Sequence, residues 1–232
     1  MYKKSAKYYD ALYQALDYKR ASQRINSLIQ QINPNSKTLL DVGCGTGKHL
    51  EYLRETMEVE GLDLSTEMLE IARVRCPGVP FHQGNMVKFE VGHSFDVITC
   101  LFSSIAAVRT VENMNTAVAR MAHHLNRKGI LFVEPWFSPK DYWVDRLTAN
   151  FVDQPDLKIA WMYISEIEGS VSILDTNYLI GTPEGITYFT ERHELGLFTH
   201  EEYRDAFRRV DLEVEYDPVG LFKRGLYIGK KP

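Results

Sequence analysis

Residues 39–47 of the chain read LLDVGCGTG. A short apolar run opens it, and three glycines with the spacing G-x-G-x-G close it. The apolar run predicts a buried strand, and glycines directly after a strand permit a tight turn and a close approach of the backbone to a ligand. A helix that follows would offer that ligand backbone N–H groups that have no helical partner. The stretch therefore predicts a ligand-binding loop between a strand and a helix.

The glycine spacing and a downstream carboxylate indicate the class of ligand. A loop of the pyrophosphate-binding type needs a glycine at position 48, where this chain has Lys48. Asp63 comes 22 residues after Asp41, at the end of the next predicted strand. A carboxylate there can accept hydrogen bonds from both ribose hydroxyls of NAD or of S-adenosylmethionine. These residues predict a nucleoside ligand, and Lys48 disfavours the alternative of a nicotinamide-dependent oxidoreductase.

Strand and helix patterns alternate along residues 20–133. The expected strands are residues 38–42, 59–63, 79–83, 95–101 and 130–133. The expected helices are residues 20–32, one that continues through 51–54, 65–75 with Ser65 or Thr66 as its N-cap, and 111–125. This alternation predicts parallel β-α units whose sheet is covered by helices on both faces.

The pattern changes in the second half of the chain. Residues 159–197 are rich in β-branched and aromatic side chains, and turn residues at Gly169 and 181–185 divide them into three expected antiparallel strands. Thr199 and Glu202 have the spacing of a capping box. The helix that it opens is expected to bury Tyr203, Phe207 and Val210, and residues 213–216 and 225–228 are expected to pair as strands at a sheet edge.

The predicted fold class is therefore α/β and Rossmann-like. We expect a seven-stranded, mostly parallel sheet whose last strand is antiparallel, with helices on both faces. Residues 1–232 are expected to form a single domain. Within it, residues 138–198 are expected to form an antiparallel β insertion after the fifth strand. This insertion is expected to be a lid over the molecule that reacts with the nucleoside ligand, the acceptor.

Composition limits the partners of the chain. Its net charge is −4 and it has no basic run, which disfavours nucleic acid and anionic membranes as partners. No apolar run is long enough to span a membrane, and the first residues lack the apolar core of a secretion signal. Cys44, Cys76 and Cys100 are widely spaced, which predicts reduced thiols in a cytoplasmic protein and no metal site. We expect a small soluble molecule as the substrate.

Five segments, in chain order, resemble the motifs of class I S-adenosylmethionine-dependent methyltransferases. They are DVGCGTG (41–47), GLDLSTEM (61–68), QGNM (83–86), FDVITCL (95–101) and LNRKG (125–129). The resemblance implies S-adenosylmethionine as cofactor, with its methionyl part along Gly43 and Gly45, its ribose on Asp63 and its adenine beside Leu64. The implied cofactor-binding residues are Tyr18, Asp41, Gly43, Cys44, Gly45, Asp63, Leu64, Met68, Asn85, Met86 and Leu101.

Further segments narrow the resemblance. YYDALY (8–13), CLFSSI (100–105), VEPWF (133–137), TERHELGLF (190–198) and KRGL (223–226) resemble the N,N-dimethyltransferases of TDP-linked 3-amino-3,6-dideoxyhexoses. The likeness implies that the chain methylates the amine of a nucleotide-linked amino deoxysugar, as a monomer or homodimer. It places Tyr13 near the acceptor amine and Arg224 at the phosphates. The implied substrate-binding residues are Ser104, Glu134, Trp136, Phe137 and Arg224.

One position departs from the family. A histidine is expected there after FSSI, and this chain has Ala106 and Ala107 instead. An amine that arrives neutral needs no general base, whereas a hydroxyl acceptor depends more strongly on a general base. The departure therefore favours a nitrogen acceptor, or a base elsewhere such as His193, which with Tyr13 completes the expected catalytic residues. The two alanines would also leave room for a first methyl group.

Other interpretations stay open at this point. The acceptor can be another small amine or a hydroxyl compound, and the chain can be a non-catalytic adenosyl-binding partner of a sister subunit. Several residue types also suit plain structural roles. Trp136 and Phe137 can be core aromatics, Arg224 can be a surface arginine, and His193 in an alternating strand can be a surface or structural histidine.

Overall fold

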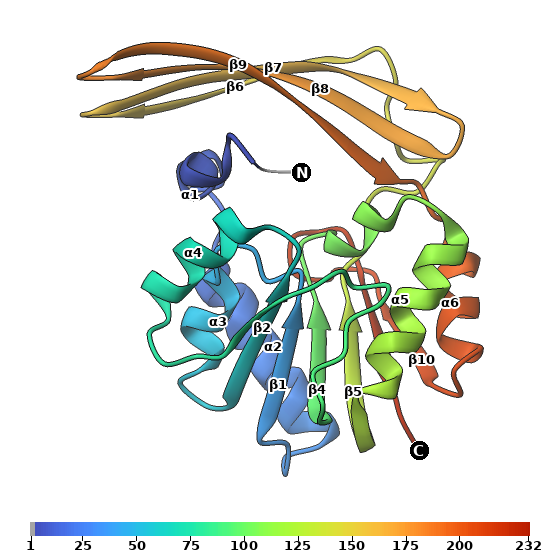
Figure 1. Ribbon diagram of the computed structural model, residues 1–232. Coiled ribbons are helices and arrows are strands. Elements are labelled where there is room, and N and C mark those ends of the chain that lie inside the picture. Colours follow the sequence, from blue (N-terminus) through green and yellow to red (C-terminus); the bar gives the residue numbers. More distant parts are fainter. Residues whose placement is uncertain (1–2) are drawn as a thin grey trace.

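The computed structural model describes residues 3–232, which form two separate sheets (Figure 1). The larger sheet has seven strands in the order β10-β11-β5-β4-β1-β2-β3. Its strands are β1 (Thr38–Val42), β2 (Glu58–Asp63), β3 (Phe81–Gln83), β4 (Phe95–Cys100), β5 (Leu125–Val133), β10 (Glu213–Asp217) and β11 (Leu226–Lys230). The first five are parallel, and β11 runs antiparallel to β5 and to β10. The predicted fold class, including the antiparallel last strand, is confirmed.

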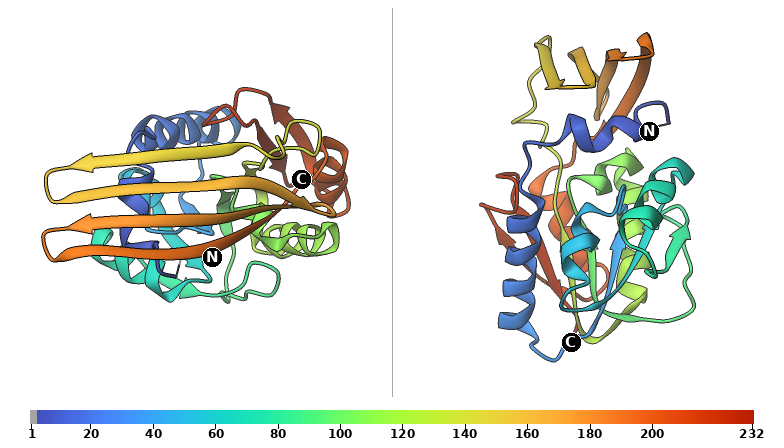
Figure 2. Two further views of the ribbon diagram at one scale, coloured as in Figure 1. Left: turned by 90° about the horizontal axis from the view of Figure 1, so that it is seen from above. Right: turned by 90° about the vertical axis from the view of Figure 1, so that its left-hand side faces the viewer.

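Helices cover both faces of the larger sheet, because its strands are apolar on both faces. On β1, Leu39 and Leu40 point to opposite faces and both are fully buried. Leu39 packs in a cluster with Ile25 and Leu50, whereas Leu40 packs with Met114 and other residues of the opposite face. One face is covered by α2 (Tyr18–Ile32), α3 (Lys48–Leu53) and α4 (Thr66–Arg75), and the other by α5 (Val111–His123) and α6 (His200–Arg208) (Figure 2).

The helix starts follow their capping residues. Ser65, not Thr66, is the N-cap of α4, where its hydroxyl accepts a hydrogen bond from the Met68 N–H at 3.2 Å. Thr199 and Glu202 form both halves of the predicted capping box on α6. The end of α6 corrects one expectation: Val210 lies beyond the last helical residue, where it packs partly buried against the core.

The antiparallel sheet has four strands, not the three that the sequence predicts. They are β6 (Leu147–Gln154), β7 (Leu157–Glu168), β8 (Val171–Thr182) and β9 (Gly185–Gly196), paired in that order. The sequence pattern misses β6 because Val152 is its only buried residue, so the apolar periodicity of a strand is weak there. The tight turn between β7 and β8 contains Gly169, whose φ of 61° explains the glycine.

The antiparallel sheet lies over the carboxyl ends of the parallel strands, with the start of the chain between the two sheets (Figures 1 and 2). That first segment contains a short 3₁₀ helix, η1 (Ala6–Tyr8), followed by α1 (Tyr9–Leu12). Tyr8 and Leu12 pack against Val152 and Ile159 on the inner face of the antiparallel sheet. Within residues 3–232, no helix is long and apolar enough to cross a membrane.

Candidate active site

A cavity of about 820 Å³ lies between the two sheets. It opens at the carboxyl ends of β1 and β2, beside the point where the strand order reverses between β1 and β4. Ligands of open α/β sheets bind at this place, because loops of opposite direction leave a crevice there. The walls come from the glycine loop, the ends of β2 and β3, the start of the chain and the inner face of the antiparallel sheet.

The glycine loop is built for close approach. Gly43, Gly45 and Gly47 have φ values of 77°, 54° and 76°, which residues with a side chain rarely adopt. A Cβ at Gly43 would lie 2.6 Å from the Cβ of Ser104, so Gly43 is required by its neighbour. A Cβ at Gly45 would meet no atom within 4 Å, so the backbone of Gly45 faces open cavity.

Asp63 connects this loop to β2. Its Oδ2 accepts a hydrogen bond from the Gly45 N–H at 2.8 Å, and its Oδ1 accepts one from the Ser65 N–H at 2.8 Å. Burial raises the pKa of Asp63, although these backbone N–H groups favour its charged form. The carboxylate is part of the cavity wall, so it can accept hydroxyl donors of a ligand.

Asp41 lies behind the loop and outside the cavity. It is 2% exposed and accepts a hydrogen bond from the Thr99 hydroxyl at 2.7 Å. The pairing of β1 with β4 places these two residues opposite each other. Burial raises the pKa of Asp41 to about 7, and the negative charge of Asp63 adds to this rise. Any contact of Asp41 with a ligand would therefore pass through the loop.

The side of the cavity next to Asp63 has apolar and amide groups that fit a purine. Leu64, Met68, Asn85 and Met86 are all part of this wall. Leu64 is 66% exposed, which is unusual for a large apolar side chain and leaves it available to a flat ring. The donor set, the open backbone at Gly45 and the Asp63 carboxylate together fit an adenosyl cofactor.

The opposite side of the cavity is aromatic and contains the guanidinium of Arg224. Arg224 donates a hydrogen bond from Nη1 to the Ser103 hydroxyl at 3.0 Å. Its Cζ lies 4.9 Å from the ring centroids of Phe102 and Trp136 and 5.5 Å from that of Phe137. These three rings and the bond to Ser103 surround the guanidinium and hold it in place.

Glu134 supports this arrangement from within the core. It is fully buried and accepts hydrogen bonds from the backbone N–H groups of Phe102 at 2.7 Å and Phe222 at 3.2 Å. Burial raises the pKa of Glu134, while the Phe102 N–H and the charge of Arg224 oppose the rise. Glu134 therefore joins the two segments that carry Phe102 and Arg224, and it does not line the cavity.

Tyr13 enters the cavity from the start of the chain. Its ring centroid is 4.7 Å from that of Tyr9, 5.2 Å from that of Phe102 and 6.0 Å from that of Trp161. The phenol thus lies between the larger sheet and the antiparallel sheet, on the same side of the cavity as Arg224.

His193 lies on the inner face of β9, in the cavity wall. It is 5% exposed, and its Nε2 is 3.3 Å from the hydroxyl of Tyr178. Burial lowers the pKa of His193 to about 4, although the charge of Glu191 favours protonation. The imidazole is therefore neutral near pH 7, which is the form that can accept a proton.

This lowered pKa predicts an acid-dependent loss of stability. Between pH 7 and pH 5 the unfolded chain takes up a proton at His193 that the folded chain does not, so the free energy of unfolding should fall by about 2 kcal/mol. Replacing His193 by glutamine should remove that part of the pH dependence in urea unfolding. An unchanged pH dependence in the variant would show that the folded histidine titrates normally.

The cavity brings together most of the expected site residues, but not all. Tyr18, Asp41, Cys44, Leu101, Glu134 and Phe137 do not line it. Tyr18 is instead packed edge-on against His49 at 5.1 Å. Ala107 lines the cavity at the position expected for histidine, whereas Ala106 is fully buried behind it.

The sequence predicted the antiparallel insertion and His193 on it, but it did not single out the aromatic residues of that sheet. Trp161, Tyr163 and Tyr178 line the cavity from its inner face. For Trp161 and Tyr163 the sequence gives one signal: they are at positions i and i+2, which places both on one face of a strand. That spacing does not reveal whether the face meets a cavity or a core.

A second cavity, of about 630 Å³, adjoins the first. Trp136 and Arg224 line both cavities, so the guanidinium stands at their junction. The second cavity also has Phe137 and Tyr216 as aromatic walls and Lys140 and Lys223 as cationic groups. Within the described chain, residues 3–232, no three His, Cys, Asp or Glu side chains are placed to hold a metal ion.

Comparison with known proteins places this geometry in context. Residues 39–129 match the family described as "Methyltransferase domain". The chain is 37% identical over 228 residues to the dTDP-3-amino-3,6-dideoxy-alpha-D-glucopyranose N,N-dimethyltransferase of Streptomyces fradiae, covering 97% of this chain and 89% of that protein.

Solved structures agree over the whole length. The crystal structure of Streptomyces venezuelae DesVI superposes with a TM-score of 0.94 at 33% identity, covering 100% of both chains. S-adenosylmethionine-bound CalS10, an amino pentose methyltransferase from Micromonospora echinaspora involved in calicheamicin biosynthesis, has a TM-score of 0.88 at 33% identity, covering 100% of this chain and 98% of that one. Because both matches extend through the antiparallel sheet, they include the acceptor side of the cavity.

Proposed function

The chain belongs to the family of S-adenosylmethionine-dependent N-methyltransferases of amino sugars, and on this premise we propose that it dimethylates the amine of a nucleotide-linked deoxysugar. The protein is an enzyme and its cofactor is S-adenosylmethionine. One observation carries the proposal for the acceptor: a single cavity joins the Asp63 carboxylate to the aromatic wall that holds the Arg224 guanidinium.

We assign the cofactor to the glycine-loop side of the cavity. Asp63 would accept hydrogen bonds from the ribose hydroxyls, and Leu64 would cover one face of the adenine. The open backbone at Gly45 would lie along the methionyl part. The bound cofactor supplies a methyl group on a positively charged sulfur, ready for displacement by a nucleophile in line with it.

We assign the nucleotide-linked sugar to the aromatic side. A guanidinium suits phosphate oxygens because its fork of N–H donors matches their geometry. With the diphosphate on Arg224, the sugar would lie on Trp136 in the first cavity and the nucleoside would extend into the second. The cations Lys140 and Lys223 and the ring of Tyr216 there suit a phosphorylated nucleoside.

The remaining residues would align the amine and exclude water. A displacement at carbon mainly requires that nucleophile, methyl and sulfur are held in line, so positioning contributes most of the rate enhancement. The amine must be neutral when it attacks, and it loses a proton after each transfer. We propose that Tyr13 orients the amine, that His193 is a neutral hydrogen-bonding partner in the same site, and that residues 138–198 act as the lid that excludes bulk water. Because the lowered pKa of His193 makes it a weak base, the proton of each methylated amine would pass to water when the site opens.

Removing the Tyr13 hydroxyl tests the orienting role. Tyr13→Phe keeps the ring contacts with Tyr9 and Trp161 and deletes one hydrogen-bonding group, so kcat should fall by about 10-fold or more. Steady-state kinetics with saturating S-adenosylmethionine measures this. Unchanged kcat and unchanged acceptor KM would show that Tyr13 is only a packing residue.

Ala107 bears on the number of methyl groups. A small side chain at this position of the cavity wall leaves space for an amine that already carries one methyl group. The absence of a histidine at this position also keeps open another small amine as acceptor. We therefore test the acceptor class by mass spectrometry with TDP-3-amino and TDP-4-amino deoxysugars, their hydroxyl counterparts and simple amines.

The result expected is a mass increase of two methyl groups on a TDP-amino sugar, with S-adenosylhomocysteine formed in step. Transfer to a simple amine alone would assign the same fold to another acceptor. Transfer to a hydroxyl counterpart alone would contradict the nitrogen chemistry argued from Ala107.

We also propose that the chain forms a homodimer through the outer face of the antiparallel sheet. Seven large apolar side chains on that face are at least 39% exposed: Leu147, Phe151, Met162, Ile164, Leu179, Ile186 and Tyr188. Together they expose on the order of 800 Å², which is what each partner contributes to an interface of standard size. Sedimentation of the protein as a monomer at micromolar concentration would contradict this.

The three buried thiols are in keeping with a cytoplasmic location.

A further inference from the structure

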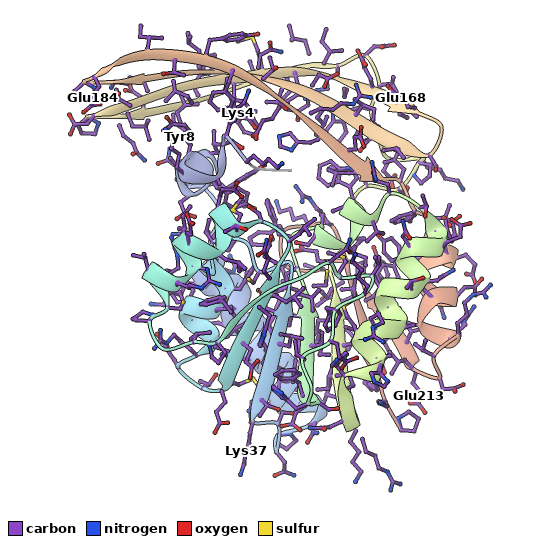
Figure 3. The ribbon with its side chains drawn as sticks, in the orientation of Figure 1. Lys4, Tyr8, Lys37, Glu168, Glu184 and Glu213 are labelled. Atoms are coloured by element: carbon purple, nitrogen blue, oxygen red, sulfur yellow. The ribbon has the colours of Figure 1, made fainter. Side chains whose placement is uncertain are left out.

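Residues 3–13, here called the N-terminal strap, cross the space between the two sheets. Tyr8 packs under the antiparallel sheet, and Figure 3 shows Lys4 and Tyr8 directly below it. Tyr9 and Tyr13 line the main cavity from the strap. The strap therefore carries the tyrosine to which we assign the acceptor amine, and what holds the strap also sets the position of that tyrosine.

The first tether of the strap is on the antiparallel sheet. Glu191 of β9 accepts hydrogen bonds from the backbone N–H groups of Lys3 at 2.8 Å, Lys4 at 2.7 Å and Ser5 at 3.2 Å. The hydroxyl of Ser5 donates a further bond to the same carboxylate. Burial opposes the charge on Glu191, but the bonds from Ser5 and Lys4 hold its pKa below its ordinary value. One carboxylate thus fixes the beginning of the strap.

The second tether is on the cofactor loop. Asp10 of α1 accepts a hydrogen bond from the Thr46 hydroxyl at 2.8 Å and forms an ion pair with Arg75. Arg75 also donates from Nε to the Thr46 carbonyl oxygen at 2.9 Å and from Nη1 to Glu51 at 3.3 Å. Thr46 is 2% exposed and the Arg75 side chain is 14% exposed, whereas the Asp10 side chain is 31% exposed, so water partly screens the ion pair but not the bond at Thr46.

The second tether completes a short path between the cofactor side and the acceptor side of the cavity. Thr46 directly follows Gly45, whose N–H is bonded to Asp63, the carboxylate that we assign to the cofactor ribose. Asp10 lies in the first turn of the short helix α1, and Tyr13, three residues later, is the C-cap of that helix. Gly45, Thr46 and Asp10 therefore connect the ribose carboxylate to the helix that carries the acceptor tyrosine, through bonds that the structure shows.

We propose that Asp10 is a positioning residue that couples cofactor binding to the placement of Tyr13. A ribose bound to Asp63 restrains Gly45 and Thr46, and Thr46 restrains Asp10 and the strap. An acceptor that meets a restrained strap loses less freedom on binding, so the cofactor strengthens acceptor binding, and the effect is reciprocal. This inference rests on the proposed function only where it assigns Tyr13 to the acceptor.

Amide hydrogen exchange of the strap tests the coupling without any acceptor. Saturating S-adenosylhomocysteine should slow exchange in residues 3–13 of the wild-type protein by about tenfold or more. Asp10→Ala should abolish this slowing at a concentration of S-adenosylhomocysteine that calorimetry shows to be saturating for the variant. Glu51→Gln is the matched control, because it removes the other carboxylate on Arg75 without touching the strap, and it should keep the slowing.

Steady-state kinetics supplies the second readout. Asp10→Ala should raise the acceptor KM several-fold and lower kcat, with a smaller change in the KM for S-adenosylmethionine, and Asp10→Glu should restore part of the loss. If Asp10→Ala impairs folding, Thr46→Val gives the same comparison, since it keeps the shape of the side chain and removes the hydroxyl that donates to Asp10.

Two results would overturn the coupling: exchange in the wild-type strap that ignores S-adenosylhomocysteine, or slowing in Asp10→Ala equal to that of the wild type. Failure of the proposed function looks different. In that case the wild-type enzyme transfers no methyl group to an amino sugar, while the strap still responds to S-adenosylhomocysteine.

Discussion

Asp63→Ala is expected to weaken S-adenosylmethionine binding by at least about 100-fold, because two hydrogen bonds to a charged group are lost, each contributing about 1.5–3 kcal/mol. The variant also loses the bond from the Gly45 N–H, which holds the glycine loop in place. Isothermal titration calorimetry of wild type and variant with S-adenosylmethionine measures the change in Kd directly.

Glu60→Gln is the matched control for this experiment. Glu60 is on the same strand, β2, three residues before Asp63, and its carboxylate is paired with His82 and His93 outside the cavity. The Kd of the Glu60→Gln variant for S-adenosylmethionine should stay within about twofold of the wild-type value. A folded Asp63→Ala protein that binds the cofactor nearly as tightly as wild type would show that the ribose is held elsewhere.

Arg224→Met should raise the KM for a nucleotide-linked acceptor by about 10- to 100-fold, the cost of one or two charge-assisted bonds to phosphate. Methionine retains part of the apolar contact with Trp136 and Phe102, so packing is largely kept. The KM for S-adenosylmethionine should change little, because Arg224 is on the opposite side of the cavity from Asp63. Initial rates with each substrate varied in turn separate the two effects.

Two further variants define the role of the guanidinium. Arg224→Lys keeps the charge without the planar fork and should give an intermediate KM. Arg208→Met removes an arginine that pairs with Glu201 and Asp205 on the surface of α6, and it should behave as wild type. An acceptor KM that does not rise in Arg224→Met would show that Arg224 does not bind the diphosphate.

The sequence predicted those parts of the site that depend on local patterns. The glycine loop, its strand and helix, and Asp63 at the end of the next strand are all consecutive features, and the structure places Gly43, Gly45 and Asp63 together on one cavity. The capping residues Ser65 and Thr199 are of the same kind, because an N-cap acts on the N–H groups two or three residues further along. Such features can be recognised from neighbouring residues alone.

The parts that sequence reasoning missed depend on contacts between distant segments. Strand β6 was not predicted because its inward face has only one buried apolar residue, Val152, and its pairing is supplied by its partner β7. Asp10 and Glu191 lie within the segments 8–13 and 190–198 that resemble the family, but nothing in those segments shows that they hold the strap. The bond from Ser5 to Glu191 spans 186 residues of sequence. The inward face of the antiparallel sheet likewise becomes a cavity wall only when the sheet lies over the larger one.

Two residues illustrate how placement changes an interpretation. His193 was expected in a surface or structural role or as a substitute base, and it is buried in the cavity wall with a lowered pKa. Glu134 was expected to contact substrate, and it instead binds the backbone of Phe102 and Phe222. In both cases the residue type was informative, but only the packing around it shows which groups it can reach.

A crystal structure of the enzyme with S-adenosylhomocysteine and a TDP-amino deoxysugar would show where each ligand binds. We expect the cofactor and the amino sugar in the cavity between the sheets, with the ribose on Asp63, the diphosphate on Arg224 and the amine beside Tyr13, facing the cofactor sulfur. The nucleoside should extend into the second cavity. An amino sugar bound outside the cavity between the sheets, or a diphosphate with no contact to Arg224, would contradict the proposed function.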